Sequence, residues 1–274
     1  MVIQSSKIRN HFLILTLLIF SNQVFSQNEC EELIKNNQCL DAIAACSILA
    51  EGNDPNAQIA LSRLYSGTLY GDFRRNYKKA FQFMEAAANQ GNTEAEVAMA
   101  EMYMRGEVVP LSAKKAIPWY EKAYAKGDVD AINGLARLYR YGSGVRKNQE
   151  KAFEYYQMAS LKNHTRSQVG LGMAYRDARG VKKNLIYAYA WFSIASSKID
   201  DDEYRQYRKT YEDEQENLNR DLPQCEYVLE GKLFGDVFAV GYGKQMLKDL
   251  KKRLSVKQIR KAEALASELR LTIE

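Results

Sequence analysis

Few side chains in this chain are of the types that carry out chemistry, and they are poorly spaced for it. The sequence contains two histidines, His11 and His164. A Ser-His-Asp triad depends on a histidine, and zinc sites usually need several His or Cys ligands. His11 falls in an N-terminal segment that we expect to be removed, so only His164 remains. We expect His164 to have a loop role at a helix end, since histidine tolerates left-handed backbone better than most residues.

Two polar clusters have simple explanations. Residues 142–144 read Gly-Ser-Gly but lack the Lys-Ser/Thr that a phosphate-cradling loop requires. Residues 200–203 are four consecutive carboxylates without the alternating ligands of a calcium loop, and they favour an exposed helix start. The sequence therefore predicts no catalytic residues, no metal and no cofactor, and we do not expect an enzyme.

Four cysteines, at positions 30, 39, 46 and 225, allow three disulfide connectivities. Cys39 and Cys46 are seven residues apart, about 10 Å on one helix, which is too far for a bridge. Residues 29–35 and 40–50 resemble the arms of a helical hairpin, with Cys30 and Cys46 equidistant from its turn. We predict a Cys30–Cys46 disulfide, with Cys39–Cys225 as a weaker consequence. The alternative, Cys30–Cys39 with Cys46–Cys225, remains open.

The first 26 residues have the pattern of a signal peptide. Lys7 and Arg9 precede an apolar run over 12–20, and the smaller residues Val24 and Ser26 stand at positions −3 and −1 before Gln27. The run is too short to span a bilayer, which needs about 20 apolar residues. No lipid-attachment pattern precedes Cys30. The sequence predicts export, with the bacterial periplasm as the destination and secretion into the medium as the alternative.

The charge balance excludes one class of partner. The whole chain carries a formal charge of +5, and removal of Lys7 and Arg9 leaves +3 (5 − 2). Acidic and basic residues are interspersed along the remaining sequence, so no nucleic-acid footprint is expected.

A repeat of 36 residues is the strongest signal in the chain. Lys-Ala occurs at 79–80, 115–116 and 151–152, and Tyr-Ala follows at 187–188. Within each unit, apolar residues recur every three or four positions over two stretches separated by a turn, which is typical of two helices. Asn76, Ser112, Asn148 and Asn184 stand where N-caps of the second helices belong. Because one hairpin cannot bury both of its faces, the units must stack, and the sequence predicts an all-α, right-handed α-solenoid.

The repeated pattern Ala-x-x-x-Leu-Gly-x-x-Tyr-x-x-Gly-x-Gly-Val, followed by Asn-x-x-Lys-Ala-x-x-Trp-Tyr-x-x-Ala-Ala-x-x-Gly, resembles the Sel-one-like repeat family, relatives of tetratricopeptide repeats. The resemblance covers four repeats at 57–197, preceded by an N-terminal helical cap at 27–56. Residues 244–274 resemble the closing helices of such arrays, with Ser255 as an N-cap. Residues 198–243 match nothing in the pattern. For this insert we expect a solvated helix over 200–220 and an irregular or short β segment around the glycines of 231–243.

The resemblance implies a non-catalytic scaffold that binds another protein, a subunit of a periplasmic or inner-membrane complex such as a secretion system, on its concave face. No small-molecule substrate is implied. A secreted host-interaction factor is the alternative. Some family members are cysteine-rich β-lactam-binding proteins, but the units at 57–197 contain no cysteine, which disfavours a hydrolase. The family's inward positions correspond to Ile59, Arg63, Ser66, Val97, Glu101, Met104, Asn133, Arg137, Arg140, Val169, Met173 and Arg176.

Overall fold

The computed structural model describes residues 26–36, 38–66, 76–199, 203–206, 209 and 231–273. Every regular element in these residues is a helix. The helices are α2 (Gln27–Lys35), α3 (Cys39–Glu51), α4 (Pro55–Ser66), α5 (Tyr77–Asn89), α6 (Thr93–Arg105), α7 (Ala113–Ala125), α8 (Val129–Tyr141), α9 (Gln149–Leu161), α10 (Thr165–Asp177), α11 (Leu185–Ser196), α13 (Gly231–Lys251) and α14 (Val256–Arg270). None of the described helices is long and apolar enough to cross a membrane.

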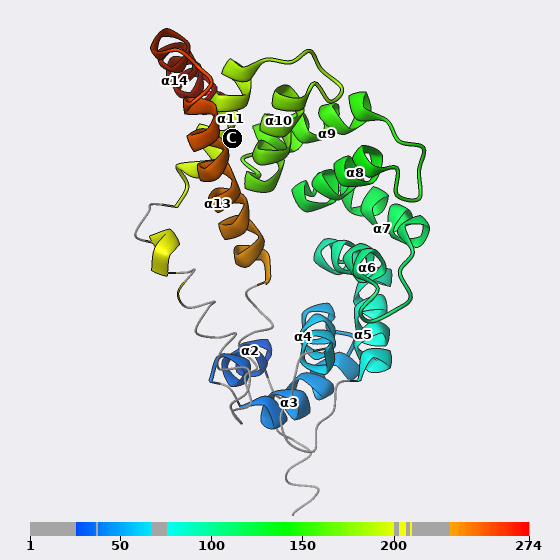
Figure 1. The fold of residues 1–274 in the computed structure, drawn as a ribbon. Coiled ribbons are helices and arrows are strands. Elements are labelled where there is room, and N and C mark those ends of the chain that lie inside the picture. The colour runs from blue at the N-terminus through cyan, green and yellow to red at the C-terminus, as the bar shows by residue number, and fades with distance from the viewer. Residues whose placement is uncertain are drawn as a thin grey trace, which may run out of the picture.

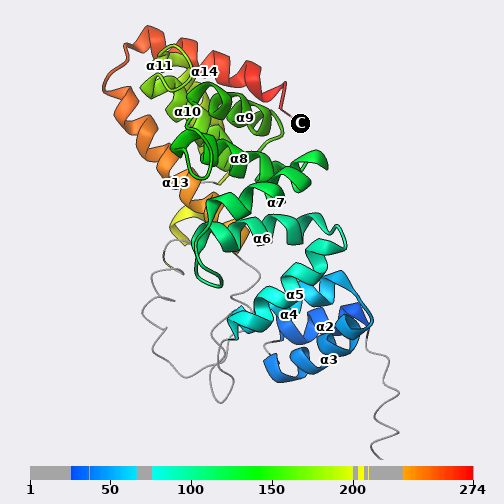
Figure 2. The same ribbon diagram turned by 90° about the vertical axis from the view of Figure 1, so that its right-hand side faces the viewer.

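The helices stack as consecutive antiparallel hairpins. α4 packs on α5, α6 on α7, α8 on α9 and α10 on α11, and each hairpin also contacts the next. The stack curves, so that α4, α6, α8 and α10 line its inner side while α5, α7 and α9 lie outside (Figure 1). The view turned by 90° shows the same succession from α2 to α14 (Figure 2). The prediction of an all-α solenoid is confirmed.

Residues next to the helix boundaries determine where the helices of the repeats begin and end. The four predicted N-cap side chains accept hydrogen bonds from backbone amides in the first turns of α5, α7, α9 and α11. Gly106 and Gly142 end α6 and α8 in the left-handed conformation, which costs glycine little. Ala178 takes the same conformation after α10, with φ at 57°. Alanine is strained there because its Cβ crowds the following carbonyl.

Lysine and tyrosine recur together at the edge of the array where each first helix connects to its second helix. The lysine ammonium lies over the tyrosine ring in three units: Lys79 over Tyr65 at 4.9 Å, Lys115 over Tyr103 at 5.6 Å and Lys151 over Tyr139 at 4.2 Å. In the fourth unit Tyr187 replaces the lysine, and its ring lies 5.0 Å from that of Tyr175. The Lys-Ala repeat thus marks a cation–π contact that joins the two helices of a unit.

Neighbouring units fit by matched side-chain size. Tyr120 of α7 lies against Gly134 of α8, where an added Cβ would stand 2.5 Å from Tyr120 Cζ. Tyr156 of α9 and Gly170 of α10 repeat this fit one unit later. One unit earlier, the corresponding positions are Met84 of α5 and Ala98 of α6, which belong to one core cluster. A large ring on one helix therefore goes with glycine on the next.

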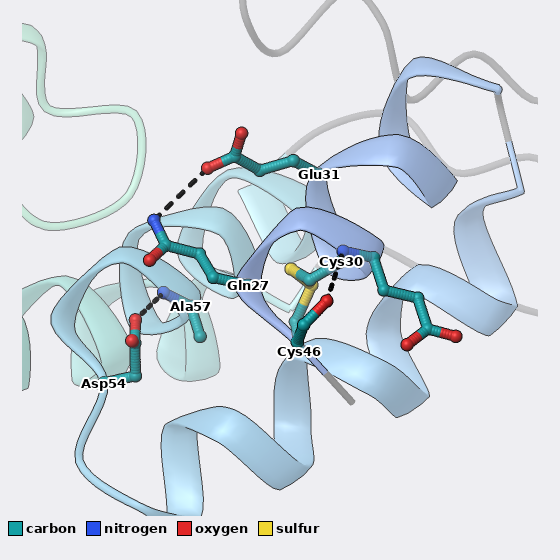
Figure 3. The surroundings of a disulfide bond; sticks show 8 residues. Gln27, Cys30, Glu31, Cys46, Asp54 and Ala57 are labelled. Carbon is teal, nitrogen blue, oxygen red and sulfur yellow. Dashed lines mark hydrogen bonds between the residues drawn. A yellow bond between two sulfur atoms is a disulfide. The ribbon is translucent and has the colours of Figure 1, made fainter. Parts of the chain in front are cut away.

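The α2–α3 hairpin precedes the repeats and is held by a disulfide. Cys30 and Cys46 are bonded, with Cα atoms 5.3 Å apart, and both are fully buried (Figure 3). The predicted pairing is confirmed. Cys39 is also disulfide-bonded. Its predicted partner, Cys225, lies outside the described residues, as do residues 1–25 of the predicted signal peptide.

The C-terminal part corrects one expectation. α13 is a continuous helix from Gly231, so the irregular or β segment expected over 231–243 is wrong, and the closing hairpin begins before residue 244. Its glycines permit close packing: a Cβ at Gly241 would stand 2.7 Å from Tyr204 Cζ, and one at Gly243 would stand 2.7 Å from Ser196 Oγ. Of the helix expected over 200–220, residues 203–206 are helical and most of the remainder lies outside the described residues.

Candidate partner-binding face

The first helices of the four repeats form the inner face of the array, and the predicted binding residues are distributed along it. Arg63, Val97, Glu101, Met104, Arg137, Arg140, Met173 and Arg176 are partly exposed there. Three predictions need correction. Val169 is 5% exposed and packs in the core with Ala188 and Phe192. Asn133 is 5% exposed, and its Oδ1 accepts a hydrogen bond from Ser167 Oγ at 3.1 Å, so it joins α8 to α10. Ile59 is 3% exposed and packs in the core beside Met84 and Met99.

Ion pairs between successive first helices fix several charged residues of this face. Arg63 Nη2 of α4 lies 2.5 Å from Glu94 Oε1 of α6. Arg137 Nη1 of α8 lies 3.5 Å from Glu101 Oε1 of α6, and Arg105 also approaches that carboxylate. Arg63 and Arg137 thus each pair with a carboxylate of a neighbouring first helix.

Glu101 is also tied to the helix behind it. The buried Tyr120 hydroxyl of α7 donates to Glu101 Oε1 at 2.7 Å. Burial, and then the negative charge of Glu101, raises the pKa of the Tyr120 hydroxyl far above its usual range. Tyr120 therefore remains a neutral donor that orients the carboxylate toward Arg137.

The C-terminal half of the face combines arginine with sulfur. Arg140 Nη2 lies 3.9 Å from Met173 Sδ, and its guanidinium lies 4.9 Å from the Tyr141 ring. Arg176 donates to Asp177 Oδ1 at 2.7 Å and contacts Met246 of α13. Hydrogen bonds from Arg176 hold the pKa of the Asp177 carboxyl below its usual value. The surface here offers polarisable apolar groups beside fixed positive charge.

A cleft of about 340 Å³ opens at the N-terminal end of the face, between α2, α4 and the start of α6. Ile34, Ile59, Ala60 and Leu64 supply its apolar lining. The polar lining consists of Gln27, Glu31, Lys35, Asn56, Arg63 and Glu94. The predicted residues Ile59 and Arg63 therefore meet in one concavity, with the Ile59 side chain in its buried lining rather than on an open surface.

The disulfide fixes one wall of this cleft. Glu31 and Ile34 come from α2, whose Cys30 is bonded to Cys46 of α3 (Figure 3). In the same helix Gln27 Nε2 donates to Glu31 Oε1 at 3.3 Å. The covalent bond thus ties α2 to α3, which in turn packs on α4. Sequence reasoning missed this cleft, because positions on α2 lay outside the repeat pattern used to select inward residues.

A buried network joins the third and fourth repeats at the edge opposite the lysine–tyrosine contacts. His164 is the N-cap of α10 and accepts from the Ser167 backbone amide through Nδ1, at 3.2 Å. The ring proton is therefore assigned to Nε2, which lies 3.1 Å from Asp130 Oδ1 of α8. Arg166 also binds Asp130. The left-handed residue at this helix end is Asn163, not His164, so the role expected for the histidine is corrected to capping.

The hydrogen bonds of this network run from Ser167 to His164 to Asp130, as in a Ser-His-Asp catalytic triad. The sequence analysis did not predict this arrangement. Ser167 Oγ lies 2.8 Å from His164 Nδ1. However, Ser167 is fully buried, and its hydroxyl donates to Asn133. No substrate carbonyl has access to it, and the network serves as a joint between repeats. Asp130 and Arg166 occupy the same position in successive repeats, 36 residues apart. This spacing was the signal in the sequence for their ion pair.

The described part of the chain offers no cluster of three or more His, Cys, Asp or Glu side chains placed to hold a metal ion. Of the four carboxylates at 200–203, only Glu203 lies among the described residues. The charged groups of the inner face instead pair with one another.

Comparisons with known proteins agree with this architecture. The family model described as Sel1 repeat matches residues 55–92, 93–128, 129–164 and 165–200, more than half of the chain. A search of the curated proteins gives no match. The solved structure of c5321, described as a protective antigen present in uropathogenic Escherichia coli strains, has a TM-score of 0.62 at 22% identity. That match covers 85% of this chain and 41% of c5321, so this chain spans less than half the length of that protein. A Sel1 repeat protein from Oxalobacter formigenes has a TM-score of 0.56 at 24% identity, covering 65% of this chain and 73% of that protein.

Proposed function

Because this chain belongs to the Sel1 repeat family, whose repeats are generally protein-interaction scaffolds, we propose that it is a non-catalytic adaptor holding a segment of another protein on its concave face. The observation that carries the proposal is the cleft between α2, α4 and the start of α6, at the N-terminal end of the row of first helices. A cleft of this volume suits one or two apolar side chains of an extended peptide.

The chemistry of the face defines the partner segment. An apolar side chain would occupy the cleft against Ile34 and Leu64, between the ionic groups of Lys35 and Glu31. Farther along, Met104 and Met173 offer adaptable apolar contacts beside Arg137 and other cationic groups. We therefore expect a partner segment that alternates apolar and acidic residues.

We further propose that the adaptor acts in the bacterial envelope, supporting assembly of a periplasmic or inner-membrane complex. The basic and apolar pattern of residues 1–26 and the Cys30–Cys46 disulfide support an exported, oxidised protein. Fractionation of cells tests the location. Recovery in the periplasm is the expected result, and recovery in the medium would instead favour the secreted host-interaction factor.

Binding is tested by capture from envelope extracts, followed by titration with the purified partner. Arg137→Glu with Arg140→Glu should weaken the interaction at least about tenfold, because an acidic segment would then meet negative charge. Lys114→Glu with Lys162→Glu makes the same charge change on exposed positions outside the first helices and should bind normally. Undiminished binding by the arginine variant would reject the inner face as the site.

A further inference from the structure

The turn between α13 and α14 concentrates positive charge. Seven basic side chains within residues 248–261 are exposed, against one acidic residue, Asp249. They form what we name the basic turn: Lys248, Lys251, Lys252, Arg253, Lys257, Arg260 and Lys261. The turn projects at the C-terminal end of the array, far from α2 and α3 (Figure 2).

The charges of the basic turn are not neutralised by the part of the chain that the structure describes. None of the seven side chains takes part in an ion pair there, in contrast to Arg63 and Arg137 on the inner face and to Arg166 in the network between repeats. Asp249 accepts a hydrogen bond from Gln245 Nε2 at 3.4 Å. A concentrated charge without internal counter-charges favours an anionic partner.

The turn is also rigidly held, so its charges stay together without a partner. Leu250, Leu254 and Ala262 are buried against Tyr189 and Phe192 of α11. Ser255 and Gln258 close the start of α14 with a reciprocal capping box. The loop that enters α11 near this cluster adds two more exposed lysines, at 182 and 183.

We infer that the basic turn docks the protein on an anionic phospholipid surface. The turn projects from the array, and five of its seven charges are lysines, whose compact ammonium groups bind phosphate as point charges and need no fixed bidentate geometry. Val256 is 67% exposed at the start of α14, so an aliphatic side chain accompanies the charges to the lipid interface. An acidic protein would need a complementary groove to be selected, and a lipid surface needs none.

Docking through this turn leaves the inner face open, because the turn lies beyond the row of α4, α6 and α8 (Figure 1). The inference is independent of the partner proposed for the concave face. Either can fail without the other, since one assay uses protein-free vesicles and the other uses a purified partner without lipid.

Co-sedimentation with vesicles tests the inference. The purified chain should bind vesicles containing about one third phosphatidylglycerol and not vesicles of phosphatidylcholine alone, and binding should be lost between roughly 0.05 M and 0.5 M salt. Each basic residue near such a surface contributes roughly fivefold to binding. Lys251→Glu, Lys252→Glu and Lys257→Glu together should therefore weaken binding at least roughly a hundredfold.

The matched control changes Lys78, Lys114 and Lys162 to Glu, which alters the net charge equally at exposed positions of other helices. This control should keep most of the binding, which would show that the location of the charge matters. Equal loss in the two variants would overturn the inference, as would binding that ignores lipid charge. Failure to bind anionic vesicles, with capture by immobilised polyglutamate, would overturn it in favour of an acidic protein partner.

Discussion

Replacing Gly134 by alanine should destabilise the array, although alanine is the better helix former. The new Cβ would stand 2.5 Å from Tyr120 Cζ and 2.8 Å from its Cδ1. The ring has little room to move, because it is 1% exposed and its hydroxyl is held by Glu101 at 2.7 Å. Overpacking of this kind costs about 1–3 kcal/mol, against a gain of about 1 kcal/mol in helix propensity. A contact this close to a held ring places the cost in the upper part of that range, about 2–3 kcal/mol, so we expect a net loss of about 1–2 kcal/mol in the free energy of unfolding.

The first boundary between repeats indicates a second substitution that should compensate for Gly134→Ala. One repeat earlier, Met84 packs near Ala98, so methionine in place of the ring tolerates alanine on the facing helix. Tyr120→Met combined with Gly134→Ala reproduces that pair. Because the two sites touch, the double variant should be more stable than the sum of the single changes by at least about 1 kcal/mol.

Urea unfolding followed by circular dichroism measures these differences. Gly235→Ala is the control for helix propensity alone, because the nearest atoms to its added Cβ are those of Arg166 at 3.5 Å. That variant should be as stable as the parent or gain up to about 1 kcal/mol. The size-matching argument is wrong if Gly134→Ala equals the parent in stability, or if the double variant shows no coupling.

Three further predictions concern stability. Ala178→Gly should add about 1 kcal/mol by relieving the left-handed strain after α10, and a lower thermal midpoint would contradict it. Cys30→Ser with Cys46→Ser should cost about 3 kcal/mol, because the bond joins residues with a sequence separation of 16, and hydrogen exchange should show the loss confined to α2 and α3. The pKa of Asp177 is depressed, so its contribution to stability is present above the unfolded pKa of about 3.9 and is lost as pH falls through the folded pKa. Asp177→Asn should flatten the acid limb of the stability profile, and an unchanged slope would refute this.

Much of the fold could be predicted because its causes are local. The N-caps Asn76, Ser112 and Asn148 satisfy amides three residues away, and the 36-residue step fixes which faces are apolar. The Cys30–Cys46 bond also followed from a short hairpin. Each of these features depends on spacing along the chain.

The errors arose where distant segments meet. The glycines of α13 indicate a break when read alone, but Gly241 and Gly243 allow close contact with Tyr204 and Ser196. The repeat pattern assigns Asn133 to a position on the inner face. In the structure Ser167 of α10 donates a hydrogen bond to Asn133, which is therefore buried between the two helices. Such contacts depend on how tightly neighbouring units pack, which spacing alone does not specify.

The paired sizes at unit boundaries also restrict how an array like this can gain repeats by duplication. The unit α8–α9 presents Gly134 at its front and Tyr156 at its back, so a second copy could follow the first with ring facing glycine. The unit α6–α7 presents Ala98 at its front and Tyr120 at its back, and a tandem copy would place the ring against the alanine. Internal duplication of the third unit is therefore free of this clash, whereas duplication of the second unit would incur the overpacking cost described above unless Ala98 first changes to glycine.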